Sequence, residues 1–266
     1  PQPLLDAAMG YVDAAVRQAR EAADAPEAGF DITVESEIPL GAGLGSSAAV
    51  VVAGIDAATR ALGEPLDRRE IADRAYRAEY EVQDGQASRA DTFCSAMGGA
   101  VRVEGDDCTT LSTPTLPFVV GFDGGAGDTG KLVADVRALR DRYDFAADTV
   151  AAIGDIVSTG EELLREADPN ADPSDALIEE LGDLMNINHG LLSALGVSSR
   201  SLDTMVWAAR EAGAEGAKLT GAGGGGCIVA LDRTDETRTS LRYTPGCEDS
   251  FRAELATEGV RVEEDD

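Results

Sequence analysis

The sequence has 266 residues, enough for one large domain or two small ones with a substantial hydrophobic core. Its 50 Asp and Glu residues outnumber its 22 Lys and Arg residues, so the formal net charge is −28. A surface this acidic repels nucleic acids and anionic membranes, and we expect neither as a partner.

The first part of the chain is predicted to contain mainly helices. Apolar residues at helical spacing predict a helix over Leu4–Ala23, and alternating apolar and polar residues predict a half-buried strand over Phe30–Glu37. A glycine-rich stretch follows, and an alanine- and valine-rich segment then predicts a helix over Ala48–Leu62. The other elements expected in this part are a helix over Asp67–Val82, a polar connection over Gly85–Met97 and a short strand over Gly99–Glu104.

Two prolines, Pro114 and Pro117, mark the expected junction between two domains, which would span residues 1–116 and 117–266. The elements expected beyond it are strands over Phe118–Phe122, Glu215–Leu219, Cys227–Leu231 and Val260–Glu263, and helices over Lys131–Arg142, Asp148–Glu166, Ser174–Leu195, Ser201–Ala212 and Glu248–Thr257. Helices and strands mix without a repeat, so an α+β architecture fits best.

The stretch from Pro39 to Ala49, PLGAGLGSSAA, lies between the predicted strand and the following helix. Its glycines let the backbone approach a ligand closely, and the free N–H groups of a helix N-terminus carry about half a positive charge. This combination is typical of a phosphate site. The alternative is a tight turn capped by Ser46 or Ser47, but such a turn needs one glycine rather than three.

A second glycine-rich stretch, Lys218–Cys227, contains five glycines within six positions. Each glycine costs about 0.5–1 kcal/mol in backbone entropy, so an ordinary hairpin does not explain them, whereas close approach to another loop or to a ligand does. A third candidate, Gly125-x-x-x-x-Gly130-Lys131, has the spacing of a Walker phosphate loop, but the next residue is Leu132 rather than a magnesium-binding Ser or Thr. We therefore expect a flexible strand-to-helix turn near a substrate there.

Both glycine-rich stretches resemble motifs of the GHMP kinases, the family of galactokinase and of homoserine, mevalonate and phosphomevalonate kinases. Pro39–Ala49 is similar to the second motif, which wraps the ATP phosphates, and Lys218–Cys227 is similar to the third, which packs beside it. The segment Glu79–Asp91 resembles that of mevalonate kinases, and the string Asn186–Leu192 resembles the corresponding helix of archaeal mevalonate kinases. The resemblance spans nearly the whole chain.

The resemblance implies a two-domain GHMP kinase fold, with a ribosomal protein S5 domain 2-like N-terminal domain and a ferredoxin-like C-terminal domain. It implies ATP-dependent phosphorylation of the 5-hydroxyl of mevalonate, with Mg2+ as the metal cofactor. Asp91 would be the base, and Ser47 and Glu79 the magnesium ligands, with Glu81 as a competitor for the metal. The residues implied to bind the nucleotide are Pro39, Leu40, Gly41, Ala42, Gly43, Leu44, Gly45, Ser46, Ser47, Ala48 and Ala49, and those implied to bind the substrate are Thr220, Gly221 and Ala222.

Other members of the family, including phosphomevalonate kinases, mevalonate 3-kinases and homoserine kinases, stay open, as does a non-catalytic ligand sensor with this fold. The first motif of the family, a proline-glycine-lysine entry, has no counterpart in this sequence, which begins at the helix expected to follow it. We therefore expect an N-terminally truncated chain that is weakly active or inactive by itself. A homodimer is also left open.

The single histidine, His189, has no nearby residue that pairs with it as a nucleophile. We expect it to pack or hydrogen bond within the helices rather than to act in catalysis. The four cysteines show no C-x-x-C spacing, which argues against a zinc site and a disulfide scaffold. No apolar run approaches membrane-spanning length, and a reducing cytoplasm is the expected location.

The acidic excess predicts that stability depends on salt. We interpret it as adaptation to a salt-rich cytoplasm, where concentrated cations screen the repulsion among the acidic groups. The melting temperature should therefore rise when potassium chloride is increased from low to molar concentration. A melting temperature that gains nothing from salt would rule this interpretation out.

Overall fold

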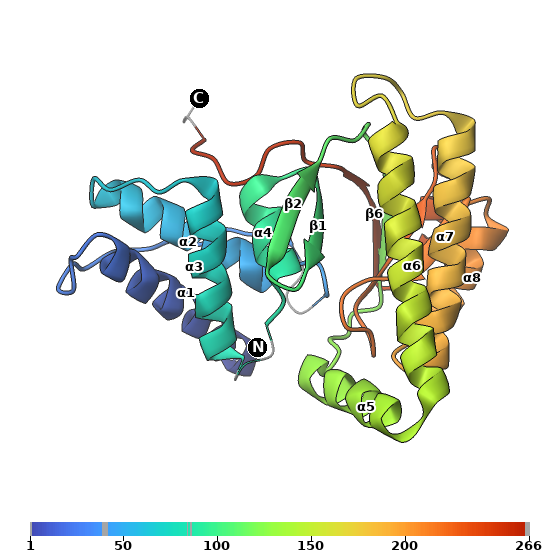
Figure 1. Ribbon diagram of the computed structural model, residues 1–266, viewed down its shortest axis with the longest axis horizontal. Helices are drawn as coiled ribbons and strands as arrows, with labels where there is room; N and C mark the ends of the chain where they lie inside the picture. Colours follow the sequence, from blue (N-terminus) through green and yellow to red (C-terminus); the bar gives the residue numbers. More distant parts are fainter. Residues whose placement is uncertain (1, 39–41, 84, 86, 264–266) are drawn as a thin grey trace. The chain divides into compact units, whose positions relative to one another are not determined.

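The computed structural model describes residues 2–38, 42–83, 85 and 87–263. The chain forms two compact units (Figure 1). The first unit comprises the described residues within 1–40, 45–111 and 256–266, and the second comprises those within 41–44 and 112–255. Both contain helices and strands, which confirms the predicted α+β class. Within the described ranges, no helix combines the length and the apolar character needed to cross a lipid bilayer.

The first unit contains helices and an antiparallel hairpin. Its elements in the described residues are α1 (Gln2–Ala22), α2 (Ser46–Ala61), α3 (Arg68–Val82), α4 (Arg89–Met97), β1 (Ala100–Glu104) and β2 (Asp107–Leu111). Side chains cap two of the helices: Asp67 accepts from the Glu70 N–H at the start of α3, and Ser88 accepts from the Ala90 N–H at the start of α4. These caps satisfy donors that a helix leaves unpaired in its first turn.

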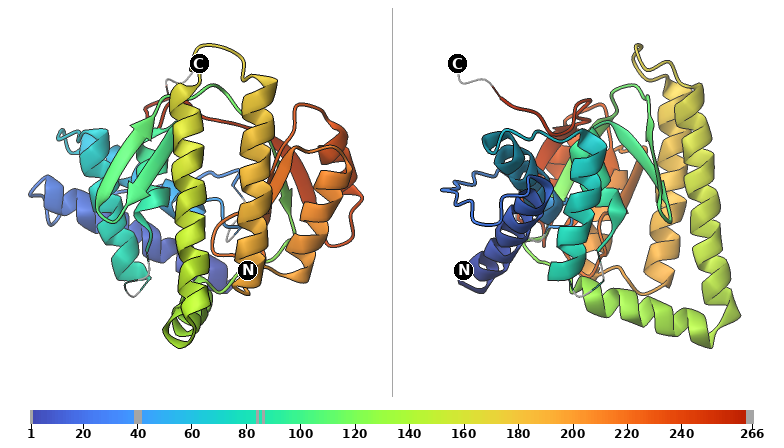
Figure 2. Two further views of the ribbon diagram at one scale, coloured as in Figure 1. Left: turned by 45° about the vertical axis from the view of Figure 1, so that its right-hand side comes forward. Right: turned by 60° about the vertical axis from the view of Figure 1, so that its left-hand side comes forward.

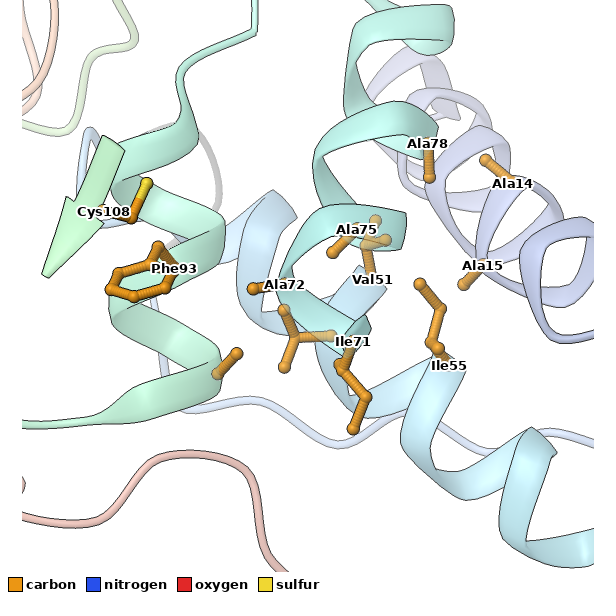
Figure 3. Close-up of a cluster of buried hydrophobic side chains, with 12 residues drawn as sticks. Ala14, Ala15, Val51, Ile55, Ile71, Ala72, Ala75, Ala78, Phe93 and Cys108 are labelled. Atoms are coloured by element: carbon orange, nitrogen blue, oxygen red, sulfur yellow. The ribbon is translucent and has the colours of Figure 1, made fainter. Parts of the chain in front are cut away.

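Small and branched apolar side chains bring the helices of the first unit together (Figure 3). Ile55 of α2 and Ile71 of α3 are fully buried in this core, and Phe93 extends it to α4. A Cβ atom on Gly54 would lie 3.0 Å from the Cβ of Ala15, so these small residues let α1 and α2 pack closely. The core therefore holds α2 against α1, α3 and α4.

Two predictions for the first unit are wrong. Residues Phe30–Glu37 form no strand, and Ile32 and Val34 are exposed. A strand requires a partner for its N–H and C=O groups, and no described residue pairs with this segment. The predicted polar connection Gly85–Met97 contains α4, because Phe93 on this segment reaches the core. The strand β2, which pairs with β1, was not predicted.

The second unit contains an antiparallel sheet with the strand order β4-β5-β3-β6. Its elements are β3 (Pro117–Phe122), α5 (Thr129–Arg142), α6 (Asp144–Glu166), α7 (Asp175–Ala194), α8 (Arg200–Glu211), β4 (Gly216–Leu219), β5 (Cys227–Leu231), α9 (Glu236–Arg242) and β6 (Asp249–Glu254). The succession β3, α8, β4, β5, α9, β6 is a β-α-β-β-α-β arrangement, which confirms the predicted ferredoxin-like domain. The additional helices α6 and α7 lie side by side (Figure 2).

The two faces of this sheet pack against different partners. Alternate residues of β3 point to opposite faces, as in any strand. Val119 contributes to the core formed with α8 and α9, where Leu241 is fully buried. Val120 packs on the other face, in a cluster that includes Ala42 and Leu44. This second face therefore supports part of the first glycine-rich stretch.

The predicted helix over Glu248–Thr257 is wrong, because this segment contains the strand β6. The edge of β3 provides backbone partners for β6, which the sequence of the segment alone does not reveal. Helix α9 was not predicted, and residues 260–263 form no strand, contrary to prediction.

The segment after β6 packs within the first unit. The Gly99 N–H donates to the Ala256 carbonyl at 2.6 Å, and the Val260 N–H donates to the Ala96 carbonyl at 3.2 Å. The first compact unit thus includes residues from both sides of the predicted junction. The division into residues 1–116 and 117–266 stays a prediction about the family domains.

The substitution Gly98→Ala should destabilise the first unit. Gly98 has a φ angle of +74°, and a Cβ atom there would lie 2.3 Å from the Gly259 nitrogen. With a ψ angle of −179°, Gly98 lies in a backbone region that is essentially restricted to glycine, where alanine costs about 1–3 kcal/mol. Overpacking adds about 1–3 kcal/mol, so we expect the free energy of unfolding to fall by about 2–6 kcal/mol.

Gly63→Ala is the matched control. Gly63 has a φ angle of +83°, and a Cβ atom there would meet nothing within 4 Å. Only the backbone cost of about 1–2 kcal/mol should remain. Chemical denaturation measures both variants, and equal losses would contradict a role for the close approach at Gly98.

Candidate active site

Helix α2 begins without a side-chain cap. Gly43 and Gly45 have φ angles of 74° and 72°, in the left-handed region that favours glycine. Gly45 is the N-cap residue and provides no side-chain hydrogen bond, while Ser46 and Ser47 already belong to the helix, so the alternative of a serine-capped turn is wrong. Uncapped N–H groups and the helix dipole together favour an anion here. Three of the predicted nucleotide-binding residues, Pro39, Leu40 and Gly41, lie outside the described residues.

The second glycine-rich stretch packs directly against Ala42 and Gly43. A Cβ atom on Gly221 would lie 2.9 Å from the Gly43 Cα, and one on Gly226 would lie 2.7 Å from the Ala42 carbonyl oxygen. The Thr220 hydroxyl donates a hydrogen bond of 3.3 Å to the Gly43 carbonyl. Close approach to another loop, one of the two explanations for these glycines, is therefore confirmed.

Asp91, in the first turn of α4, lies against the start of α2. A Cβ atom on Gly45 would lie 3.8 Å from the Asp91 Cβ and 3.9 Å from its Oδ1. The Asp91 side chain is accessible to solvent, yet the protein packed around it raises the pKa of its carboxyl group by desolvation. The structure thus brings the predicted base to the edge of the uncapped helix N-terminus.

Glu79 of α3 is buried and lies beside the same helix start. The Ser47 hydroxyl donates to Glu79 Oε1 at 2.6 Å. Burial raises the pKa of Glu79, the hydrogen bond from Ser47 lowers it, and the charge of Asp91 raises it further. Glu81, the competing candidate, is exposed and pairs with Arg17 at 3.2 Å. Of the two glutamates, only Glu79 contacts Ser47.

Ser47 and Glu79 are compatible with a magnesium ion. Among the described residues, no group of three or more His, Cys, Asp or Glu side chains could hold a metal ion. Magnesium usually takes one or two protein oxygen ligands and fills its octahedron with water and substrate phosphates. The Ser47 hydroxyl and the Glu79 carboxylate supply such a pair, which fits a metal bound together with a nucleotide.

Gln83 joins this pair and was not predicted from the sequence. Its amide nitrogen donates to Glu79 Oε1 at 3.4 Å. The sequence spacing could have predicted this contact, because Gln83 follows Glu79 by four residues, which places the two side chains together on one helix face.

The turn after β3 lacks the features of a Walker loop. Asp128 caps α5 by accepting from the Lys131 N–H at 2.9 Å, and the Lys131 ammonium pairs with Asp135 at 2.5 Å. The helix N-terminus and the lysine are therefore both engaged within the chain. Asp123 Oδ1 accepts from the Gly226 N–H at 2.8 Å, which links this turn to the second glycine-rich stretch.

His189 is buried and uses both ring nitrogens. The Leu219 N–H donates to Nδ1 at 3.3 Å, and Nε2 lies 3.2 Å from Asp203 Oδ1. Burial is the main cause that lowers the pKa of His189, so the neutral ring with its proton on Nε2 fits these contacts. The prediction of a packing and hydrogen-bonding histidine is confirmed.

Family models match both parts of the chain. Residues 10–99 match the model described as GHMP kinases N terminal domain. Residues 174–243 match the model described as GHMP kinases C terminal.

Similar proteins extend over almost all of the chain. The mevalonate kinase of Thermococcus gammatolerans is 42% identical over 260 residues, which cover 96% of this chain and 75% of that protein. The mevalonate kinase of Pyrococcus horikoshii is 43% identical, with the same coverage. The crystal structure of the Methanococcus jannaschii mevalonate kinase matches with a TM-score of 0.74 and 27% identity, covering 91% of this chain and 74% of that one.

The substitution Asp91→Asn should stabilise the first unit at neutral pH. Because burial raises the pKa of Asp91, the native state binds this proton more tightly than the unfolded state does. The ionised carboxylate therefore costs folding free energy above its raised pKa, and a neutral amide removes that cost. The melting temperature of the variant should exceed that of the unaltered protein near pH 7, and the gain should vanish below about pH 3.9, the ordinary pKa of Asp.

Asp13→Asn is the control, since Asp13 is exposed on α1 and the change in formal charge is the same. Melting curves measured across this pH range should show no comparable gain for this variant. An equal gain in both variants would assign the effect to net charge and contradict the role of burial.

Proposed function

The chain belongs to the GHMP kinase family, and on that premise we propose that it transfers the γ-phosphoryl group of ATP to the 5-hydroxyl group of mevalonate. One observation carries this proposal: the solvent-accessible Asp91 carboxylate lies beside Gly45 at the uncapped start of α2, close enough that a Cβ atom on Gly45 would touch it. Kinase chemistry on an alcohol needs a phosphate-binding backbone and a carboxylate that orients the hydroxyl proton. The choice of mevalonate rests on relatives that are 42–43% identical over 96% of the chain.

Backbone N–H groups bind the polyphosphate in this proposal. In the described part of the loop, from Ala42 to Ala49, Gly43 and Gly45 have no side chains that would keep a phosphate away from the backbone. The dipole of α2 adds partial positive charge at the same end. In a protein with only 22 basic residues, main-chain donors supply the electrostatic stabilisation that lysine or arginine would otherwise provide.

Asp91 accepts the proton of the acceptor alcohol. The hydroxyl oxygen forms a bond to the γ-phosphorus while the bond from that phosphorus to the β,γ-bridging oxygen breaks, and the leaving group is ADP. The raised pKa of Asp91 brings the carboxylate closer in basicity to the working pH, which favours proton transfer.

Ser47 and Glu79 would hold the magnesium ion. Both hydrogen bonds that Glu79 receives end on Oε1, so Oε2 accepts none from the described residues. When bound at these two residues, the metal would neutralise the negative charge of the ATP phosphates. The chain itself supplies a hydroxyl oxygen and a carboxylate oxygen, held together at 2.6 Å through Oε1.

Thr220, Gly221 and Ala222 are proposed to bind the substrate. Their location supports this assignment, because Thr220 and Gly221 contact Gly43 of the phosphate-binding loop. A substrate that contacts this segment would lie beside Gly43.

An ATP-coupled assay tests the proposal. A longer purified protein that contains this sequence together with the first motif of the family should phosphorylate mevalonate in preference to homoserine, galactose and phosphomevalonate. Asp91→Asn should lower kcat by roughly 10²–10⁴-fold, the usual contribution of a general base. Asp13→Asn should retain activity, because Asp13 is an exposed residue of α1.

Two results would contradict the proposal. Turnover that persists in Asp91→Asn would remove the assigned base. Binding of ATP without phosphorylation of any of the four acceptors would instead favour a non-catalytic sensor with this fold.

A further inference from the structure

The proposed function assigns no role to the turn after β3, residues 123–130, yet this turn packs on the second glycine-rich stretch. The Asp123 N–H donates to the Gly226 carbonyl at 3.0 Å, and the Gly226 N–H donates to Asp123 Oδ1 at 2.8 Å. A Cβ atom on Gly127 would collide with the Gly223 carbonyl oxygen, so the two backbones are in contact there as well. The turn therefore supports the glycine-rich stretch from behind.

The Asp123 side chain continues the pairing of β3 and β5 where the two strands end. The last paired residues are Phe122 and Cys227. Beyond them a carboxylate, rather than a backbone carbonyl, accepts from the N–H of the buried Gly226. A buried N–H without an acceptor is costly. The side chain at position 123 therefore determines whether Gly226 is stable in this place.

Two further donors hold the Asp123 carboxylate. The Gly125 N–H donates to Oδ1 at 2.8 Å, and the Ser201 hydroxyl donates to Oδ2 at 2.5 Å. Hydrogen bonds to a charged acceptor are stronger than those between neutral groups. Ser201 belongs to α8, which packs against β4 and β5. The carboxylate thus connects the glycine-rich stretch to the core of the second unit.

Gly226 in turn lies against the first glycine-rich stretch. A Cβ atom on Gly226 would lie 2.7 Å from the Ala42 carbonyl oxygen, and the Thr220 hydroxyl donates to the Gly43 carbonyl at 3.3 Å. All of these residues belong to the second compact unit. A continuous series of contacts therefore leads from α8 through Asp123 to residues that are proposed to bind phosphate.

We propose that Asp123 is a positioning residue, which holds the second glycine-rich stretch against Ala42 and Gly43 and so fixes where the acceptor alcohol lies. Asp123 contacts neither ATP nor the acceptor in this assignment. The effect on catalysis rests on the proposed function, whereas the effect on Gly226 does not. A misplacement of about 1 Å can lower an enzymatic rate by about 10²-fold.

Amide hydrogen exchange, followed by NMR on this chain without ligand, tests the effect on Gly226. In Asp123→Ala the Gly226 N–H should exchange roughly tenfold faster or more, because it loses its charged acceptor. Asp128→Ala is the matched control: Asp128 lies on the same turn and accepts from the Lys131 N–H. Its Gly226 exchange should equal that of the unaltered protein. Unchanged exchange in Asp123→Ala would overturn the inference.

Steady-state kinetics test the effect on catalysis, in the longer protein that includes the first motif of the family. At temperatures where melting curves show the variant to be folded, Asp123→Ala should lower kcat for mevalonate by roughly 10²-fold. A protein that is merely less stable keeps its kcat under these conditions. Asp128→Ala should keep the kcat of the unaltered protein.

Asp123→Asn should restore the activity. The amide oxygen has two lone pairs for the Gly125 and Gly226 N–H groups. The amide nitrogen can donate to Ser201, whose hydroxyl then donates to Ser199, 2.9 Å away. Because all of these contacts are kept, kcat should stay within about threefold of that of the unaltered protein.

Two kinetic outcomes would overturn the inference: an unchanged kcat in folded Asp123→Ala, or equal losses in Asp123→Ala and Asp123→Asn. If Asp123→Ala does not fold, Ser201→Ala replaces it, because it removes only the bond to Oδ2. Gly226 exchange should then rise roughly threefold, and no rise would overturn the inference.

Failure of the proposed function gives a different result. If the unaltered longer protein phosphorylated none of the four acceptors, the proposed function would fail, and the catalytic part of the inference would fail with it. Hydrogen exchange would still decide whether Asp123 holds Gly226.

Discussion

The hydrogen bond between Ser47 and Glu79 is the contact on which the candidate site depends. It joins the start of α2 to the buried face of α3 at 2.6 Å, in a region where an unpaired carboxylate would be costly. Burial raises the pKa of Glu79, and the Ser47 hydroxyl and the Gln83 amide nitrogen both donate hydrogen bonds to Oε1 of this carboxylate. Asp91 lies close enough to Glu79 for its charge to contribute to the same shift. Ionisation of Asp91 therefore affects the ionisation of Glu79.

The site also concentrates features that do not favour stability. Helix α2 lacks a side-chain cap, glycines adopt left-handed angles, and two carboxyl groups have raised pKa values. Each feature has a functional use in the proposal: free N–H groups for phosphate, close backbone approach for the loop, and basicity for proton transfer. The apolar core of α1, α2, α3 and α4 provides the stability that such a site lacks.

Most helices of this chain were predictable, because the 3.6-residue spacing of apolar residues is a local property. The helices α2, α3, α7 and α8 follow their predicted ranges within a few residues. Strands were less predictable, since a strand depends on a partner that can lie far away in sequence. Phe30–Glu37 has the alternation of a strand and no partner among the described residues, whereas β6 has a partner in β3 that its own sequence does not reveal.

The sequence by itself determined the glycine-rich loop, the family, and the acidic residues from which the site is drawn. Only the tertiary structure distinguishes Glu79 from Glu81: both lie near the end of α3, but Glu79 accepts a hydrogen bond from Ser47 of α2, whereas Glu81 pairs with Arg17. Motifs record which chemical groups are present along the chain, while the distances that make those groups act together arise from helix packing.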